Sequence, residues 1–452
     1  MLDYNYLLTD VLSNVSAYRK FIAKEAVITA ELPSFEALPL QDKNNYLLSY
    51  DLKELCREED LQSFHLIGAS SGFSKTGAIY WPKRPCDEEG YMQSIESMLV
   101  ENYQIDKKRT LVIECLAFGM WIGGMQIATA IRNIALSDKY PFTIATPGLD
   151  FRATIRVIQD YKELFGQILI ITNPSNISLF KALLDDAKID LPEQCVSFPV
   201  VGEYFTEHFR EHIATQFGHP KDSPYVVWTG YGSADTGDVG AETASTIALR
   251  KYFHANPKAS QAWFGTTSTP MILALSSSVY VEVIDGNIVV TKNQFIPLIR
   301  YNTKDAGGLL FKKELEGKIP ASLYESLPEE MIYVCGRADN AIIFYGTNLM
   351  VNDISDFLLS LPSEKRYGGL YTVHETDNKG ISCFEFVIYV NKVEESLSRW
   401  YFDALIAFLC SHSAEFAVKY NNLSRSIDIP LIRVTVEDVK KLDSKVKHRF
   451  II

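Results

Sequence analysis

The 452-residue sequence lacks several features that define broad classes of protein. No apolar run approaches the roughly 20 residues that a membrane-spanning helix needs, so we expect no membrane-embedded part. The seven cysteines are odd in number and include no C-x-x-C pair, which indicates reduced thiols rather than a disulfide framework. The first residues, MLDYNYLLTDVLSN, contain no basic segment, so we expect no secretory signal and a cytoplasmic location.

Positive charge is also scarce. The chain has 44 Lys and Arg against 56 Asp and Glu, a net charge of −12, which argues against a general nucleic-acid or anionic-membrane binder. We find no internal repeat and no low-complexity segment. With 47% hydrophobic and 22% charged residues, the composition is typical of a globular protein, and the length allows two or three domains.

Strand and helix patterns alternate between residues 109 and 217. Four short apolar runs (TLVIECLAF, PFTIAT, QILIIT and CVSFPVV) each precede a segment with helical periodicity, which predicts βαβ units and a mostly parallel, helix-covered sheet. Further on, 279–292 reads as a hairpin, and the chain after about residue 340 reads as a small α+β domain. We therefore predict an α/β protein with a large domain over residues 1–335 and a small one over 336–452.

The stretch from Tyr225 to Asp238, YVVWTGYGSADTGD, combines an apolar run with three glycines. The apolar run predicts a buried strand that ends at the glycines, and in open α/β sheets ligands bind at such strand ends. A tight turn explains the glycines equally well. A dinucleotide site is not expected, because Asp235 replaces the third glycine of the fingerprint and Arg250-Lys251 stand where the ribose-binding acid belongs.

A loop of small and hydroxylated residues runs from Leu66 to Gly77. Its backbone N–H groups, its hydroxyls and Lys75 could surround phosphate groups. It is not a Walker A loop, because Ala69 and Ser74 stand where both glycines are required. A surface loop without a ligand accounts for the same composition.

His208, Glu211 and His212 match the inverted zinc-peptidase pattern H-x-x-E-H. The two imidazole rings would lie one helical turn apart, with Glu282 as a distant third ligand. The same residues also form an ordinary solvated helix face, and five-residue matches arise often by chance. A zinc peptidase is therefore the lesser alternative.

Six segments, in order and spacing, resemble motifs of the adenylate-forming enzymes, most closely the phenylacetate–CoA ligase-like branch with its CapK relatives. The resemblance runs from about residue 38 to the end. Residues 70–77 are similar to the family's S-S-G-T-T-G-x-P phosphate loop, with Phe73, Lys75 and Gly77 as departures. Residues 200–203 are similar to the G-G-E turn, and residues 231–235 to Y-G-x-x-E.

The resemblance continues toward the end of the chain. Residues 297–305 are similar to P-x-I-R-Y-R-T-x-D, residues 336–339 match the G-R-x-D hinge, and residues 444–448 stand where the family has G-K-x-x-R. By register the catalytic lysine would be Lys445, with Lys447 as the alternative. The shorter Asp235 stands where the family has glutamate.

The resemblance implies a role for each matched residue. Tyr231 would stack on adenine, Asp305 would bind the ribose hydroxyls, and Lys445 would bridge the carboxylate and the α-phosphate. The assigned residues are the phosphate-binding Ser70, Ser71, Gly72, Ser74, Lys75 and Thr76; the nucleotide-binding Gly202, Glu203, Tyr231, Gly232, Ser233, Asp305 and Arg337; the hinge Asp339; the acyl pocket Phe118, Trp121 and Trp228; the metal ligands Asp235 and Glu242; and the catalytic Lys445.

The implied activity is an ATP-dependent carboxylic acid ligase that forms an acyl-adenylate. The acyl group would pass to a thiol, either of coenzyme A or of phosphopantetheine on an acyl carrier protein, with ATP and Mg²⁺ as cofactors. Adenylation brings two anions together, the carboxylate and the α-phosphate of ATP. Proximity and charge neutralisation would therefore account for most of the catalysis. A homodimer is common among the relatives. The alternative is a catalytically silent relative that binds an acid or a nucleotide as a scaffold, which Lys75 and Asp235 motivate.

Overall fold

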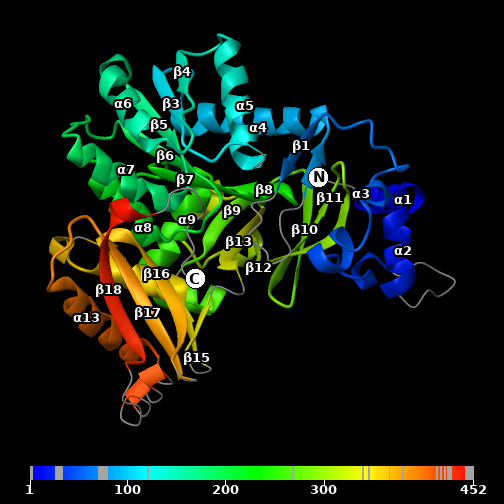
Figure 1. The fold of residues 1–452 in the computed structure, drawn as a ribbon. Helices are drawn as coiled ribbons and strands as arrows, with labels where there is room; N and C mark the ends of the chain where they lie inside the picture. Colours follow the sequence, from blue (N-terminus) through cyan, green and yellow to red (C-terminus); the bar gives the residue numbers. More distant parts are fainter. Residues whose placement is uncertain are drawn as a thin grey trace.

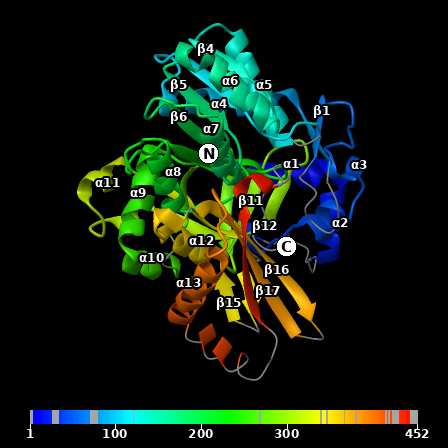
Figure 2. The ribbon, with the colours of Figure 1, turned by 60° about the vertical axis from the view of Figure 1, so that its left-hand side comes forward.

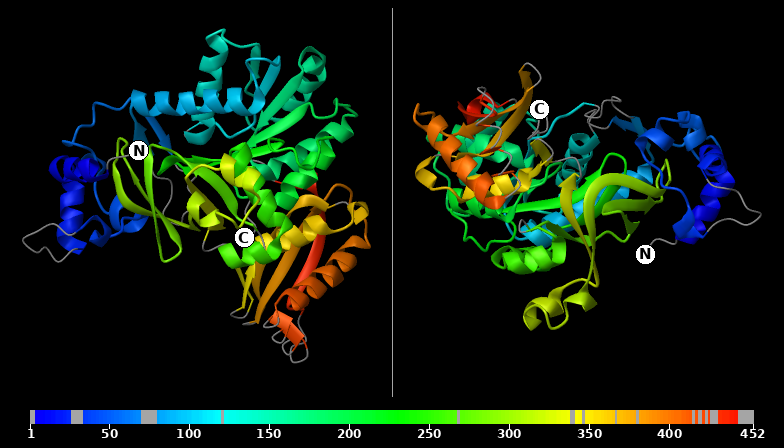
Figure 3. Two further views of the ribbon diagram at one scale, coloured as in Figure 1. Left: turned by 180° about the vertical axis from the view of Figure 1, so that it is seen from behind. Right: turned by 90° about the horizontal axis from the view of Figure 1, so that it is seen from below.

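A computed structural model describes residues 4–442, apart from 26–33, 70–79, 120–121, 267–268, 338–340, 345–346, 366, 379–380, 414–415, 418–419, 422–423 and 425–429. A large sheet with helices on both faces fills the centre (Figure 1). The N-terminal helices lie at one end of the molecule, and the C-terminal part lies toward the other, as the view from behind also shows (Figure 3).

The N-terminal helices form a layer that packs on the edge of the large sheet. Their apolar side chains form one core with residues 295–301, and a two-stranded antiparallel hairpin follows them. These elements are α1 (Tyr4–Asn14), α2 (Ser16–Glu25), η1 (Phe35–Ala37), η2 (Lys43–Leu47), α3 (Leu52–Leu55), β1 (Leu66–Ala69) and β2 (Tyr80–Lys83).

The large sheet has eleven strands in the order β10-β11-β12-β13-β9-β8-β7-β6-β5-β3-β4. Strands β4, β3, β5, β6 and β7 are parallel, as the alternating pattern predicts, and the strands from β8 to β10 continue the sheet antiparallel. Their bounds are β3 (Thr110–Glu114), β4 (Phe142–Ala145), β5 (Gln167–Ile171), β6 (Val196–Val200), β7 (Val227–Ser233), β8 (Gly237–Ala241), β9 (Met271–Leu275), β10 (Val279–Ile284), β11 (Asn287–Lys292), β12 (Leu298–Phe311) and β13 (Glu330–Arg337).

Helices cover both faces of the parallel half. Helices α6, α7 and α8 share one core with β3, β5 and β6, and helices α4 and α5 share another on the opposite face. The fold class is therefore α/β, as predicted. The helical elements of this part are α4 (Pro85–Tyr103), α5 (Ile122–Leu136), α6 (Phe151–Tyr161), η3 (Lys162–Leu164), α7 (Pro174–Asp186), α8 (Glu207–Gln216), α9 (Ala244–Ala255), α10 (Pro257–Phe264), η4 (Lys312–Leu315) and α11 (Ala321–Ser326).

The C-terminal part has a hydrophobic core of its own, drawn from residues 342–436. Figure 2 shows α12 and α13 beside its three-stranded sheet, in which β17 pairs antiparallel with β16 and parallel with β18. Its elements are β14 (Ala341–Phe344), β15 (Thr347–Met350), α12 (Val351–Ser360), η5 (Ser363–Lys365), β16 (Tyr367–Asn378), β17 (Ile381–Val390), α13 (Leu397–His412), β18 (Ile432–Asp438) and η6 (Val439–Lys441). The predicted boundary at 335/336 falls inside β13.

Two turns allow the local sequence predictions to be compared with the structure. The predicted hairpin of residues 279–292 forms, and Asp285 and Gly286 at its tip both have positive φ, as a two-residue hairpin turn requires. Strand β7 does not end at its glycines, as the sequence pattern suggests, but continues to Ser233 and pairs with β8. A Cβ atom at Gly232 would lie 2.2 Å from the Gly237 carbonyl oxygen, so glycine permits the two strands to meet there.

None of the described helices is both long and apolar enough to cross a lipid bilayer.

Candidate active site

Two tyrosine–aspartate hydrogen bonds join the β7–β8 hairpin to β12. The Tyr231 hydroxyl donates to Asp305 Oδ2 at 2.7 Å, and the Tyr301 hydroxyl donates to Asp235 Oδ2 at 2.7 Å. Burial and the neighbouring carboxylates raise the pKa of both tyrosines, so both phenols stay protonated. These contacts bring together the residues that the resemblance assigns to adenine, ribose and metal.

The turn between β7 and β8 positions Asp235. Ser233 Oγ accepts hydrogen bonds from the backbone N–H groups of Asp235, at 3.2 Å, and Thr236, at 3.1 Å. A side-chain oxygen that accepts from the backbone two and three residues later stabilises a tight turn. Ser233, which the resemblance assigns to the nucleotide, thus also shapes the turn that carries Asp235.

Lys43 from the N-terminal layer reaches the same aspartate. Its Nζ lies 3.5 Å from Asp235 Oδ2, and the neighbouring Asp42 forms an ion pair with Lys304 at 3.0 Å. The Gln41 side chain accepts a hydrogen bond from the backbone of β12, which fixes this segment against the strand. No motif in the sequence points to Lys43, because its partner lies in a distant segment.

Two more lysines are buried near the β7–β8 hairpin. Lys292 Nζ donates to the Asp238 carbonyl oxygen at 2.5 Å, and burial lowers the pKa of Lys292 to about 8. Lys83, at the end of β2, is 6% exposed, and burial lowers its pKa as well. Each of these lysines follows apolar residues of a strand, and that pattern is a signal that the sequence analysis missed.

Glu203 caps a helix. Its carboxylate accepts hydrogen bonds from the Ser175 N–H at 3.1 Å and the Ser175 hydroxyl at 3.0 Å, at the N-terminus of α7. A carboxylate is favourable there because the first N–H groups of a helix lack partners. Gly202 before it has φ +86°, which glycine adopts without strain. Glu203 also borders a small cavity between the large part and the C-terminal part, whose lining includes Phe205, Phe209, Asn352, Ser355, Leu359 and Leu370.

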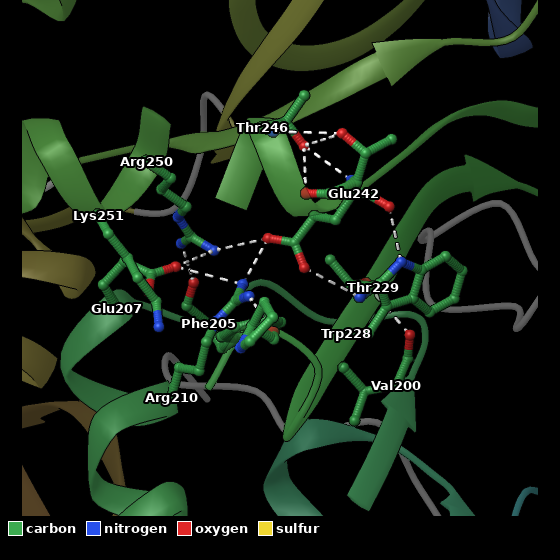
Figure 4. A network of polar contacts seen from close by, with 12 residues as sticks. Val200, Phe205, Glu207, Arg210, Trp228, Thr229, Glu242, Thr246, Arg250 and Lys251 are labelled. Atoms are coloured by element: carbon green, nitrogen blue, oxygen red, sulfur yellow. Dashed lines mark hydrogen bonds and ion pairs between the residues drawn. The ribbon is translucent and has the colours of Figure 1, made fainter. Parts of the chain in front are cut away.

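Glu242 lies in a buried ion cluster (Figure 4). Its Oε1 accepts hydrogen bonds from Arg210 at 2.5 Å and Arg250 at 3.3 Å, and its Oε2 accepts one from the Thr229 N–H at 3.1 Å. Glu207 lies 3.2 Å from Arg210 and 3.3 Å from Arg250, and all four charged side chains are fully buried. Both carboxylate oxygens of Glu242 are therefore engaged, and the structure does not present this residue as a second metal ligand.

Two of the residues assigned to the acyl pocket are described: Phe118 lies in the segment after β3, and Trp228 is the second residue of β7. Phe118 follows β3, is 36% exposed, and packs so closely on Gly148 that a Cβ atom there would lie 2.7 Å from its ring. Trp228 on β7 is buried, and its Nε1 donates to the Glu242 carbonyl oxygen at 2.8 Å. The sequence analysis missed Glu114, the last residue of β3 and an acidic residue inside the apolar run TLVIECLAF.

Several predicted site residues lie outside the described part of the chain. The backbone of Arg337 is described and pairs with Asp305 in the register of β12 with β13. The predicted residues that lie outside are Ser70, Ser71, Gly72, Ser74, Lys75, Thr76, Trp121, Asp339 and Lys445, together with the alternative Lys447.

The zinc site of the lesser alternative, based on the H-x-x-E-H match, does not form among the described residues. Within the described ranges, no three His, Cys, Asp or Glu side chains converge in a way that could hold a metal ion. His208 Nδ1 faces Asp356 at 3.3 Å and His212 Nε2 lies 2.9 Å from Gln216, so the two rings have separate partners. The expected third ligand, Glu282, forms an ion pair with Arg300 instead.

No family model matches the sequence, and no curated protein matches it. Solved structures do match. The crystal structure of 2-hydroxyisobutyryl-CoA ligase in the postadenylation state with 2-HIB-AMP superposes with a TM-score of 0.64 at 14% identity, covering 99% of this chain and 87% of that chain. A GH3.15 acyl acid amido synthetase superposes with a TM-score of 0.55 at 10% identity, covering 98% and 88%.

The same CoA ligase in its thioesterification state, with 2-HIB-AMP and CoA, superposes with a TM-score of 0.53 at 14% identity, over 99% of this chain and 87% of that chain. At these identities the likeness concerns the fold. The chain has the fold of the adenylate-forming enzymes.

Proposed function

We propose that this protein uses ATP to convert a carboxylic acid into an acyl-adenylate and then transfers the acyl group to a thiol. The acceptor would be coenzyme A or the phosphopantetheine of a carrier protein. The observation that carries the proposal is the pair of hydrogen bonds Tyr231–Asp305 and Tyr301–Asp235. They join two separate motifs of the sequence at one site, in the fold of the adenylate-forming enzymes.

The nucleotide would lie over the β7–β8 hairpin and β12. Tyr231 presents an aromatic ring to the adenine, and its hydroxyl orients Asp305, whose carboxylate accepts hydrogen bonds from the ribose. Gly232 and Ser233 leave room for the nucleotide beside the strand, and Gly202, Glu203 and Arg337 complete its surroundings. The phosphate groups would lie near Lys43 and the loop of residues 70–76.

Asp235 fits a Mg²⁺ ion better than Glu242 does. Mg²⁺ usually takes one or two carboxylates together with phosphate oxygens, and the Asp235 side chain retains some exposure. When bound, the ion would neutralise charge on the phosphates. The Tyr301 hydroxyl holds the Asp235 carboxylate in place, and Lys43 offers a second positive charge on the same side.

The C-terminal part would act as a lid hinged at Asp339, and Lys445 would approach the α-phosphate when the lid closes. Such a motion allows one site to carry out adenylation and thiol transfer in turn. Phe118, Trp121 and Trp228 would line the acyl pocket. The cytoplasm as location, the homodimer and the acyl carrier protein belong to the same proposal.

ATP–pyrophosphate exchange with Mg²⁺, measured on a panel of aryl, aliphatic and amino acids, tests this function. We expect exchange that depends on one class of acid and that falls at least about a hundredfold in Asp305→Asn, which loses a charged hydrogen-bond acceptor. Asp285→Asn, at the exposed tip of the β10–β11 hairpin, is the matched control and should exchange normally. Folded protein that exchanges with no acid would contradict the proposal.

The acceptor is decided by a second step. Acyl-adenylate formed in place should disappear on addition of coenzyme A or of phosphopantetheinylated carrier protein. Because one structural neighbour is an acyl acid amido synthetase, amino acids belong among the acceptors tested. Transfer to an amine rather than a thiol would contradict the thiol part of the proposal and leave adenylation intact.

The second candidate is a relative that binds the nucleotide without turnover and serves as a scaffold. Lys43 favours it, because an ammonium group 3.5 Å from Asp235 competes with a divalent cation for that carboxylate. Calorimetry with ATP and Mg²⁺ separates the two candidates. Binding without exchange on the whole panel would support the scaffold.

A further inference from the structure

Glu114 at the carboxyl end of β3 is fully buried, yet its carboxyl group has no ion-pair partner in the described part of the chain. Neither oxygen makes a hydrogen bond of good geometry there, although the nearby Leu116 N–H opposes part of the effect of burial on the pKa. Burial raises the pKa of Glu114 to about 8. The buried Glu207, by contrast, lies between two arginines. Buried polar groups nearly always have partners, so Glu114 requires an explanation.

The register of the parallel strands places Glu114 on the acyl side of the sheet. Glu114 lies beside Ile171 on the neighbouring strand β5. The registers of β5 with β6 and of β6 with β7 extend this row of side-by-side residues across the sheet, through Pro199 to Trp228. Val112, two residues earlier and therefore on the same face, shares a hydrophobic cluster with Trp228. Glu114 thus faces the same side as an expected acyl-pocket residue, and it is the last residue of β3, as Ile171 is of β5; ligands of such sheets bind at the carboxyl ends of the strands.

The chain just beyond Glu114 also belongs to the acyl site. Phe118 follows four residues later, and α5 begins so close to this loop that a Cβ atom at Gly124 would lie 2.2 Å from the Ala117 carbonyl oxygen. The side chains that cluster around this row of residues are apolar, so none of them can form an ion pair with an ionised Glu114 carboxylate. A protonated carboxyl both donates and accepts a hydrogen bond, which suits a neutral partner with the same two abilities.

We propose that Glu114 selects the acid substrate by hydrogen bonding to a hydroxyl or carboxamide group that the acid carries away from its reacting carboxylate. This inference rests on the proposed function and names its substrate class. Glu114 would contribute to specificity without taking part in the adenylation chemistry. A site that hydrogen-bonds a substrate hydroxyl rejects the analogue without it, because the buried protein group then lacks a partner.

Matched pairs of acids test the inference: phenylpropanoic against hydroxyphenylpropanoic acid, and hexanoic against ω-hydroxyhexanoic acid. In pyrophosphate exchange, wild type should favour the hydroxylated member of at least one pair in kcat/KM. Glu114→Gln should keep that preference, since an amide also donates and accepts. Glu114→Leu should lower the ratio of hydroxylated to plain acid at least about tenfold, because the apolar side chain makes no hydrogen bond.

The exposed residue Glu89 on α4 provides the matched control, and Glu89→Leu should leave the ratio unchanged. The same ratio in wild type and Glu114→Leu would overturn the inference and assign Glu114 a structural role. Analogues that carry an amino group in place of the hydroxyl test for a cationic ligand. If wild type prefers these amino acids and Glu114→Gln loses the preference, the inference is overturned and Glu114 binds a cation.

Failure of the proposed function can be told apart from failure of this inference. If wild type exchanges with none of the acids, calorimetric binding of the same acid pairs to wild type and Glu114→Leu still measures the preference. Tighter binding of the hydroxylated acids by wild type alone would support the role of Glu114. Equal binding of both members of every pair to both proteins would overturn it.

Discussion

Replacing Glu242 by glutamine separates a structural role from a metal-binding role. In the buried cluster, two carboxylates balance two guanidinium groups, so Glu242→Gln leaves one net positive charge without access to water. The glutamine NH₂ would also have to face either an arginine or the Thr229 N–H, all of which are donors. Removing one partner of a buried ion pair costs about 3–5 kcal/mol.

The assay is urea unfolding followed by tryptophan fluorescence, since the Trp228 ring donates to the Glu242 carbonyl oxygen and reports on this region. Glu242→Gln should unfold at clearly lower urea, in line with a loss of about 3–5 kcal/mol. Asp235→Asn should cost only about 1 kcal/mol, because an asparagine oxygen can still accept from Tyr301. For Mg²⁺ the order should be reversed, with Asp235→Asn raising the concentration needed for exchange.

The double variant Glu242→Gln/Arg210→Met provides the control for charge balance. It leaves Glu207 opposite Arg250, so its loss of stability should be smaller than the sum of the two single losses. Simple additivity would contradict the cluster as a balanced unit. A Glu242→Gln protein as stable as wild type, with a raised Mg²⁺ requirement, would refute the reasoning and restore Glu242 as a metal ligand.

Three further predictions concern single charged groups. Folding raises the pKa of Glu114 from 4.5 to about 8, so wild type should lose up to about 5 kcal/mol of unfolding free energy relative to Glu114→Gln as the pH rises from 4.5 to 8. A difference in unfolding free energy between the two proteins that does not change with pH would contradict this. Lys43→Met should lower the Mg²⁺ concentration for half-maximal nucleotide binding about three- to tenfold, because the competing ammonium near Asp235 is gone; unchanged Mg²⁺ dependence would exclude that competition. Asp356 raises the pKa of His208, so their contact between α8 and α12 should be complete below pH 6.5 and lost as pH rises through the raised pKa; limited proteolysis should show this, and Asp356→Asn should remove the pH dependence.

Local patterns predicted the architecture well where each element depends on its own residues. The alternating runs of residues 109–217 became β3 to β6 with their helices, and the Asp285-Gly286 pair formed the expected turn. The strand β7 was predicted to end too early, because glycine is a turn signal in sequence. In the structure, glycine permits close approach to a neighbouring strand, which no local pattern reveals.

The candidate site was predictable in part. The motif order led to Tyr231, Asp235 and Asp305, and the structure brings these residues into one site. Glu242 was predicted as a second metal ligand because Mg²⁺ takes one or two carboxylates together with phosphate oxygens. In the structure its carboxylate pairs with the arginines of α8 and α9.

The sequence alone determined the α/β class and the chain order of the motifs, because strand and helix periodicity are properties of neighbouring residues. Only the tertiary structure decided which charged groups meet: Lys43 pairs with Asp235, and Glu242 pairs with Arg210 and Arg250. Glu114 is buried without an ion-pair partner in the described part of the chain. The physical reason is that the energy of a charge depends on its burial and on its nearest opposite charge. Both are set by segments that lie far apart in the sequence and side by side in the fold.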